Sequence, residues 1–138
     1  MIQRQQTLWL LLATLCAIFS FQFPFLTGSK LINNQSVAED LDAASNFFLL
    51  IMTGASVILS VITIFMFKDR KLQIQLCLLG IVLSIGILAV YIVQMQKFEK
   101  STLALYCILP FVVLISYFMA FRGVRKDEKL VKSLDKLR

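Results

Sequence analysis

Two long uncharged runs, 47–67 and 72–95, are separated by only four residues, Lys68-Asp69-Arg70-Lys71. Four residues leave room for a tight turn, so the two runs must lie antiparallel. Further apolar runs occupy 7–26 and 103–121. A helix needs about 20 apolar residues to cross roughly 30 Å of hydrocarbon. We therefore predict an all-α polytopic membrane protein, with four transmembrane helices arranged as two antiparallel hairpins.

The composition excludes an ordinary soluble fold. Of the 138 residues 59% are hydrophobic and 16% are charged, whereas soluble proteins average about half apolar and a quarter charged. Lipid must therefore be the solvent for most of the surface. The net charge of +6 does not indicate nucleic acid as a partner, because the basic residues flank the apolar runs, where membrane topology places them.

Lys and Arg are distributed unequally between the two ends of the predicted spans. One end holds Arg4, Lys68, Arg70, Lys71 and the basic residues after 121, and the other holds Lys30, Lys97 and Lys100. Because the more basic side faces the cytoplasm, we predict that both termini are cytoplasmic. The first run exceeds the roughly 7–15 apolar residues of a signal peptide and lacks a cleavage motif, which favours a retained span.

The connecting loops and Pro110 give local predictions. Residues 27–46 are polar, and Ser36-Val37-Ala38-Glu39 matches a capping box, which predicts that a helix begins there. Residues 96–101 form a very short second loop. Pro110 lies within the fourth apolar run, where we expect a kink that neighbouring helices tolerate.

The second and third spans carry small residues at matching distances from the turn. Ser56 and Ser60 are four residues apart, as are Gly80 and Ser84. Small residues at this spacing allow two helix backbones to approach closely in lipid. These four residues are therefore our predicted helix-packing site.

The chain lacks the usual signs of catalysis or ion transport. It has no His, and no Asp, Glu, Lys or Arg lies inside a predicted span, although ionisable residues at membrane depth mark proton and ion pathways. No phosphate-binding loop, nucleophile motif or metal-ligand spacing is present. Cys16, Cys77 and Cys107 fall in different spans and read as buried hydrophobes. We predict a non-enzymatic protein with no cofactor or metal.

Residues 122–138 differ in composition from the transmembrane domain predicted for 1–121. Apolar side chains recur there at helical spacing, and Glu128 and Lys132 form a favourable i,i+4 pair. The segment contains seven basic and three acidic residues. These features predict a basic amphipathic cytoplasmic helix that lies on anionic lipid or docks onto a partner; the alternative is a solvated tail that only enforces topology. The predicted contact residues are Arg122, Arg125, Lys126, Lys129, Leu130, Lys132, Leu134 and Leu137.

The two ends of the chain carry a family resemblance. Residues 1–13, MIQRQQTLWLLLA, and 122–138, RGVRKDEKLVKSLDKLR, resemble the ends of a family of small four-span inner-membrane proteins typical of the Bacteroidota and known only as a domain of unknown function. The resemblance implies four spans, cytoplasmic ends and a bacterial inner membrane. It implies no activity, so it supplies no catalytic residue.

The leading functional hypothesis is an accessory or scaffold subunit of a larger membrane assembly. Its partners would be the lipid bilayer and another membrane protein or a second copy of itself. The alternative is a small oligomeric carrier or lipid-handling protein, and an intramembrane enzyme ranks third. A carrier requires a polar cavity near the middle of the membrane, whereas an accessory subunit requires none.

Overall fold

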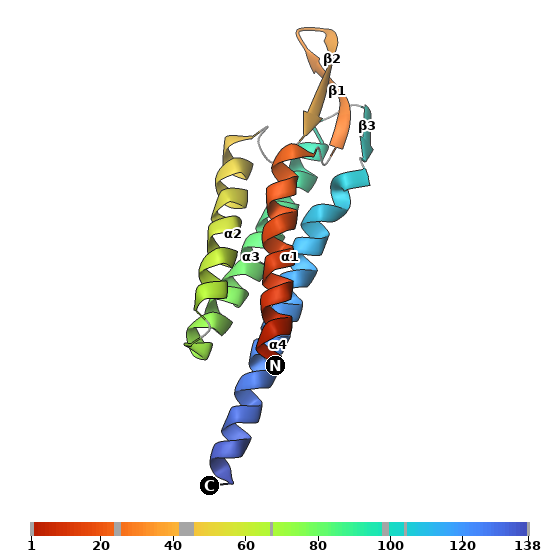
Figure 1. Cartoon of the computed structure of the whole chain (residues 1–138). Helices are drawn as coiled ribbons and strands as arrows, with labels where there is room; N and C mark the ends of the chain where they lie inside the picture. The colour runs from red at the N-terminus through yellow and green to blue at the C-terminus, as the bar shows by residue number, and fades with distance from the viewer. Residues whose placement is uncertain are drawn as a thin grey trace.

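The computed structural model describes residues 2–23, 26–41, 46–66, 68–97, 100–103 and 105–137. Within these ranges four long helices form a bundle: α1 (Ile2–Gln22), α2 (Phe47–Phe65), α3 (Arg70–Met95) and α4 (Ile108–Lys136) (Figure 1). All four are long and apolar enough to cross a membrane. The predicted four-helix membrane architecture is confirmed, and the chain is a multi-pass membrane protein.

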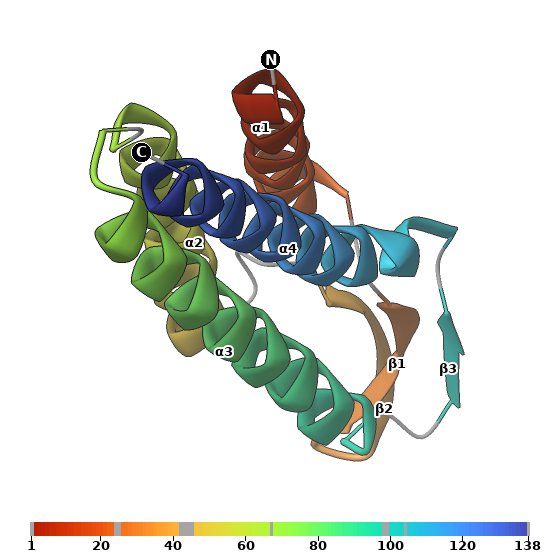
Figure 2. The ribbon, with the colours of Figure 1, turned by 90° about the horizontal axis from the view of Figure 1, so that it is seen from below.

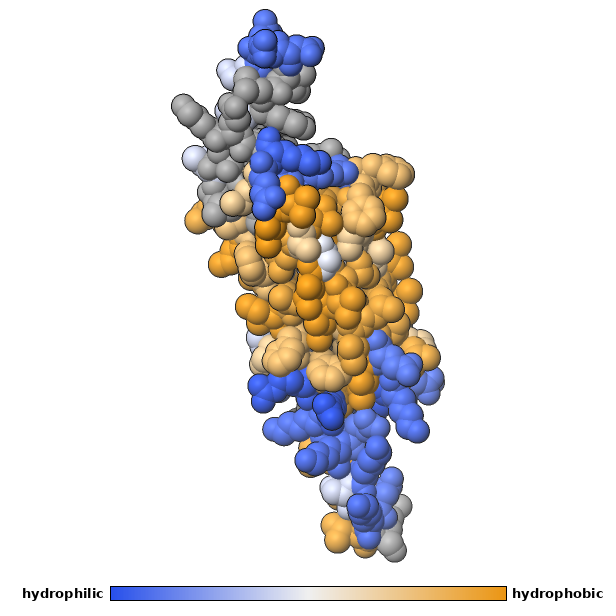
Figure 3. Space-filling model, turned by 180° about the vertical axis from the view of Figure 1, so that it is seen from behind, coloured by the Kyte–Doolittle hydropathy of each residue, from blue (hydrophilic) through white to orange (hydrophobic). Residues whose placement is uncertain are grey.

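The chain runs up and down the bundle. Both termini and the turn between α2 and α3 lie at one end, which we call the basic end, and the other connections lie at the opposite end (Figure 1). On the face seen in Figure 3, apolar side chains form a band around the middle and hydrophilic side chains gather at both ends. This is the surface expected of a protein solvated by lipid at its waist and by water at its ends.

Helix α4 differs from the predicted fourth span at both ends. It begins at Ile108, after a 3-10 turn (Leu105–Cys107), so Pro110 lies in its first turn. The predicted mid-span kink at Pro110 is therefore wrong, because the first backbone N–H groups of a helix have no carbonyl partner to lose. Helix α4 then continues without a break to Lys136. The predicted tail is helical, although the division of domain and tail at residue 121 stays a prediction.

A three-stranded antiparallel sheet caps the end opposite the termini. It consists of β1 (Leu26–Ile32), β2 (Gln35–Leu41) and β3 (Lys100–Leu103), in the order β2-β1-β3. The helix predicted to begin at Ser36 is therefore wrong. Asn33 and Asn34 have φ angles of 52° and 64°, and two positive φ angles in a two-residue loop are typical of the type I′ turn that closes a hairpin.

Strand β3 joins the two connecting segments of this end. Thr102 donates a hydrogen bond to the carbonyl oxygen of Thr27 at 3.0 Å, and the two threonine hydroxyl oxygens lie 3.1 Å apart. The sequence predicts a loop over 96–101, but Lys100 and Ser101 pair with β1 instead. The α1–α2 and α3–α4 connections are thus one structural unit.

The helices pack around two clusters of buried side chains. Helix α4 lies between α1 and α3 (Figure 2) and contacts both, while α2 contacts α1 and α3. The larger cluster includes Leu10, Leu59, Cys77, Val113 and Tyr117, and the smaller one consists of Leu49, Ile87 and Tyr91. All four helices therefore contribute to the core.

Candidate functional site

The four predicted helix-packing residues, Ser56, Ser60, Gly80 and Ser84, are all buried. The hydroxyl of Ser60 lies 2.7 Å from that of Thr14 on α1. Gly80 lies against α4, because a Cβ atom at this position would be 2.5 Å from Cε1 of Tyr117. These small residues therefore admit side chains from α1 and α4, and the direct α2–α3 contact between them stays a prediction.

Tyr117 connects three helices. Its side chain is fully buried, its ring covers Gly80 on α3, and its hydroxyl donates a 2.8 Å hydrogen bond to the backbone oxygen of Ser56 on α2. A buried tyrosine needs such an acceptor for its hydroxyl group. The ring and the hydroxyl together fix the spacing of α2, α3 and α4.

A small cavity lies beside this contact, and its lining residues include Thr53, Ser56, Ser84 and Tyr91. Its volume is about 10 Å³, which is close to the minimum for one water molecule. Thr53 Oγ1 and Ser56 Oγ are buried and have no hydrogen-bond partner within the described ranges. The cavity is therefore too small for a transported solute.

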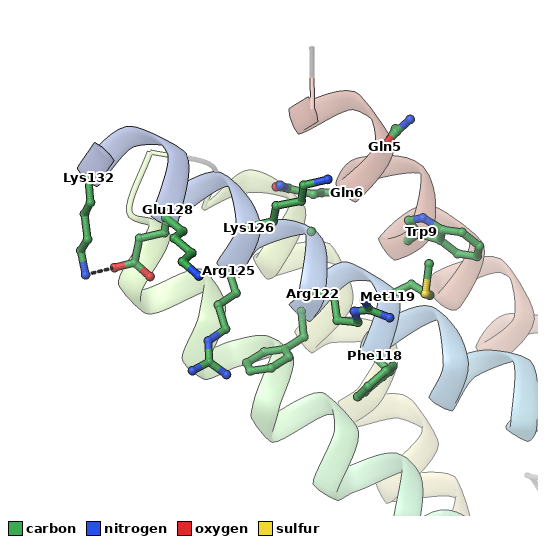
Figure 4. Close-up of a pocket in the computed structure, with 13 residues that line it drawn as sticks. Gln5, Gln6, Trp9, Phe118, Met119, Arg122, Arg125, Lys126, Glu128 and Lys132 are labelled. Carbon is green, nitrogen blue, oxygen red and sulfur yellow. Dashed lines mark ion pairs between the residues drawn. The ribbon is translucent and has the colours of Figure 1, made fainter. Parts of the chain in front are cut away.

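An open groove of about 980 Å³ lies between the start of α1 and the second half of α4 (Figure 4). We call it the basic groove. From α1 it is lined by Gln5, Gln6 and Trp9, and from α4 by Phe118, Met119, Phe121, Arg122, Gly123, Arg125, Lys126, Glu128, Lys129 and Lys132. It lies at the basic end of the bundle.

Helix α4 presents two separate faces beyond residue 121. The basic side chains predicted as contacts, at 122, 125, 126, 129 and 132, all line the basic groove, as expected when successive residues turn by about 100°. Leu130, Leu134 and Leu137 lie outside it and are 43%, 64% and 85% exposed. We call these three residues the leucine face. The predicted contact residues are thus divided between two surfaces.

The lining of the basic groove contains more basic than acidic residues. Glu128 is the one acid among its lining residues, and it pairs with Lys132 at 3.2 Å, which confirms the predicted i,i+4 pair. The Arg125 guanidinium lies 5.9 Å from the centre of the Phe121 ring, within cation–π range. Within the described part of the chain, Arg122, Lys126 and Lys129 have no acidic partner in ion-pairing distance.

Gln6 is the buried polar residue of the groove. It is only 4% exposed, and its Nε2 donates to no atom among the described residues. A Cβ atom at Gly123 would lie 2.9 Å from Cγ of Gln6, so the glycine provides the space that this side chain occupies. Sequence reasoning missed both residues, although a glycine between Arg122 and Val124 in a helical segment was an available signal.

An ion pair connects α4 to the start of α3. Arg70 Nε lies 3.7 Å from Asp127 Oδ2, and both side chains are partly exposed. Such a pair contributes roughly 0.2–1 kcal/mol. Asp127 thereby points toward α3 and leaves the basic groove without a second acid.

Among the described residues, no group of three His, Cys, Asp or Glu side chains could hold a metal ion.

Comparison with known families covers nearly the whole chain. A family model described as a domain of unknown function, DUF4293, matches residues 2–137. The chain belongs to the DUF4293 family. The match spans all four helices and the basic groove of this DUF4293 protein, and it assigns no activity to them. No curated protein and no solved structure matches the chain significantly.

Proposed function

We propose that this DUF4293 protein is a non-enzymatic accessory or scaffold subunit of a larger assembly in a bacterial inner membrane, with both termini in the cytoplasm. The observation that carries the proposal is the leucine face. Its three leucines lie on a part of α4 that projects beyond the rest of the bundle (Figure 1). Their i, i+4, i+7 spacing is that of an amphipathic helix docked in a groove of another protein.

The small size of the cavity supports an accessory subunit over a carrier. A carrier binds its substrate near the middle of the membrane, whereas the cavity among Thr53, Ser56 and Ser84 has room for about one water molecule. The many large apolar side chains exposed on the helices suit contact with lipid or with another transmembrane helix. The lipid-handling alternative is supported by one feature, the basic groove, because its cationic lining suits a lipid headgroup.

The scaffold proposal predicts that the leucine face holds a protein partner. Leu130→Ala/Leu134→Ala should reduce copurification of the partner from native membranes about tenfold or more, because burying one leucine side chain is worth roughly 1.5–3 kcal/mol. The full-length chain would carry an affinity tag, and the partner that copurifies with it would be quantified by mass spectrometry. Both leucines are exposed, so the bundle itself should keep its stability.

Lys129→Gln/Lys132→Gln is the matched control, since both lysines lie on the same stretch of α4 but line the basic groove. This pair should leave copurification largely unchanged. Partner loss in the lysine variant with none in the leucine variant would refute docking through the leucine face. Recovery of no stoichiometric partner with the unaltered chain would instead favour a solvated tail.

The proposed orientation makes a separate prediction. Single cysteines at Asn34 and Asp69, both exposed, would be introduced into a chain without its three native cysteines. A membrane-impermeant maleimide should label Asn34→Cys in intact spheroplasts, and Asp69→Cys only after lysis, because the Lys- and Arg-rich side stays in the cytoplasm. A reporter fused after Arg138 should likewise report the cytoplasm. Labelling of Asp69→Cys in intact spheroplasts would reverse the orientation.

A further inference from the structure

We propose that the basic groove is a binding site for the headgroup of an anionic phospholipid. The proposal does not depend on a protein partner, because the leucine face is a different surface of α4. Arg122, Lys126 and Lys129 line the groove, and within the described ranges none of the three has an acidic partner. Cations of this kind at a membrane surface attract phosphate groups of anionic lipids.

Besides the basic side chains, the groove contains an unpaired hydrogen-bond donor on Gln6 within the described ranges. Gln6 lines the groove, and its Nε2 is a buried hydrogen-bond donor that lacks an acceptor within the described ranges. A buried donor left unpaired costs free energy, and a phosphate oxygen in the groove supplies the acceptor. Trp9 lines the same space, and an indole ring commonly occupies this boundary between headgroups and hydrocarbon.

The apolar surface next to the groove identifies the ligand as a lipid and not a free phosphate. Phe111, Ile115 and Phe118 are exposed on α4, and their i, i+4, i+7 spacing places them on one side of the helix. At about 100° per residue, this is also the side that carries Arg122, Arg125 and Lys129. An apolar strip that continues into a cationic groove matches an acyl chain joined to a phosphate headgroup.

The chain offers a direct probe, because Trp9 is its single tryptophan and lines the groove. The purified full-length protein would be placed in phosphatidylcholine nanodiscs that contain a small fraction of brominated phosphatidylglycerol, and Trp9 fluorescence would be recorded. Brominated phosphatidylglycerol should quench Trp9 more strongly than the same fraction of brominated phosphatidylcholine. Equal quenching by the two lipids would overturn the proposal without the use of any variant.

Charge removal then locates the site. Arg122→Gln/Lys126→Gln should weaken the preference for phosphatidylglycerol about tenfold or more. Lys68→Gln/Lys71→Gln is the matched control, because it removes the same charge from exposed residues at the same end of the bundle, outside the groove. The control should keep the preference, and an equal loss in both variants would reduce the effect to general surface charge.

Soluble phosphate and the leucine face are tested in two additional arms. Excess inorganic phosphate should not relieve the excess quenching, and relief would assign the groove to soluble phosphate compounds instead of lipid. Leu130→Ala/Leu134→Ala should leave the quenching unchanged, since the leucine face lies outside the groove. Failure of the lipid site can thus be told apart from failure of the scaffold proposal.

Discussion

One methyl group added at Gly80 is expected to destabilise the bundle by about 1–3 kcal/mol, the usual cost of overpacking a core. A Cβ atom there would lie 2.5 Å from Cε1 and 2.6 Å from Cδ1 of Tyr117. The ring is fully buried, and its hydroxyl is bonded to Ser56, so moving the ring aside would disturb this hydrogen bond. Unfolding of Gly80→Ala in mixed detergent micelles, followed by circular dichroism, measures the loss, and Gly80→Leu should lose more.

Gly54 provides the matched control. It lies within α2, and no heavy atom would lie within 4 Å of an added Cβ. Because alanine favours a helix over glycine by about 0.8–1 kcal/mol, Gly54→Ala should be neutral or slightly stabilising. Equal stability of Gly80→Ala and Gly54→Ala would mean that the Tyr117 ring can move aside, and the proposed role of this contact would be withdrawn.

Tyr117→Ala is expected to have the largest effect of any single substitution proposed for this protein, about 3–5 kcal/mol, as for other large aromatic side chains removed from a core. Tyr117→Phe keeps the ring on Gly80 and loses only the hydrogen bond to Ser56. That loss should be about 0.5–1.5 kcal/mol. Equilibrium unfolding of both variants separates ring packing from the hydrogen bond.

The two positions should also be coupled, because they touch. When Tyr117 is already alanine, Gly80→Ala should cost far less than it does in the unaltered chain, since the ring it would strike is absent. Additive effects in this double-mutant cycle would contradict the contact. An alanine at Tyr117 that costs no more than a phenylalanine would show that the ring contributes little to packing.

The features that could be predicted from the sequence are those set by local composition. The charged residues Lys68 to Lys71 between two apolar runs indicated the turn between α2 and α3, and Glu128 and Lys132 are neighbours on any helix. The sheet could not be predicted in this way. Ser36-Val37-Ala38-Glu39 satisfies a capping box locally, but pairing of β2 with β1 across the Asn33–Asn34 turn satisfies the same backbone groups in a strand.

Only the α4 side of the basic groove could be predicted from the sequence. The repeat of Arg and Lys along α4 was visible in the sequence, and those residues do share a face. Gln6 and Trp9 are more than a hundred residues away along the chain, and only the packing of α1 against α4 brings them to that face. Local spacing also placed the leucines and the lysines in one contact set, although they occupy separate surfaces.

The strand order has a consequence for how the chain is completed during synthesis. Strand β1 is the central strand, and its second neighbour, β3, follows it by some seventy residues. Until residues 100–103 emerge, one edge of β1 has no partner, and the side of α1 that packs against α4 is uncovered. Pairing of β3 with β1 holds the start of the last helix next to the end of the first. Pairing of β3 with β1 thus brings α4 against α1 at the sheet end of the bundle. The basic groove, which is lined by both helices, forms only when α4 has packed against α1.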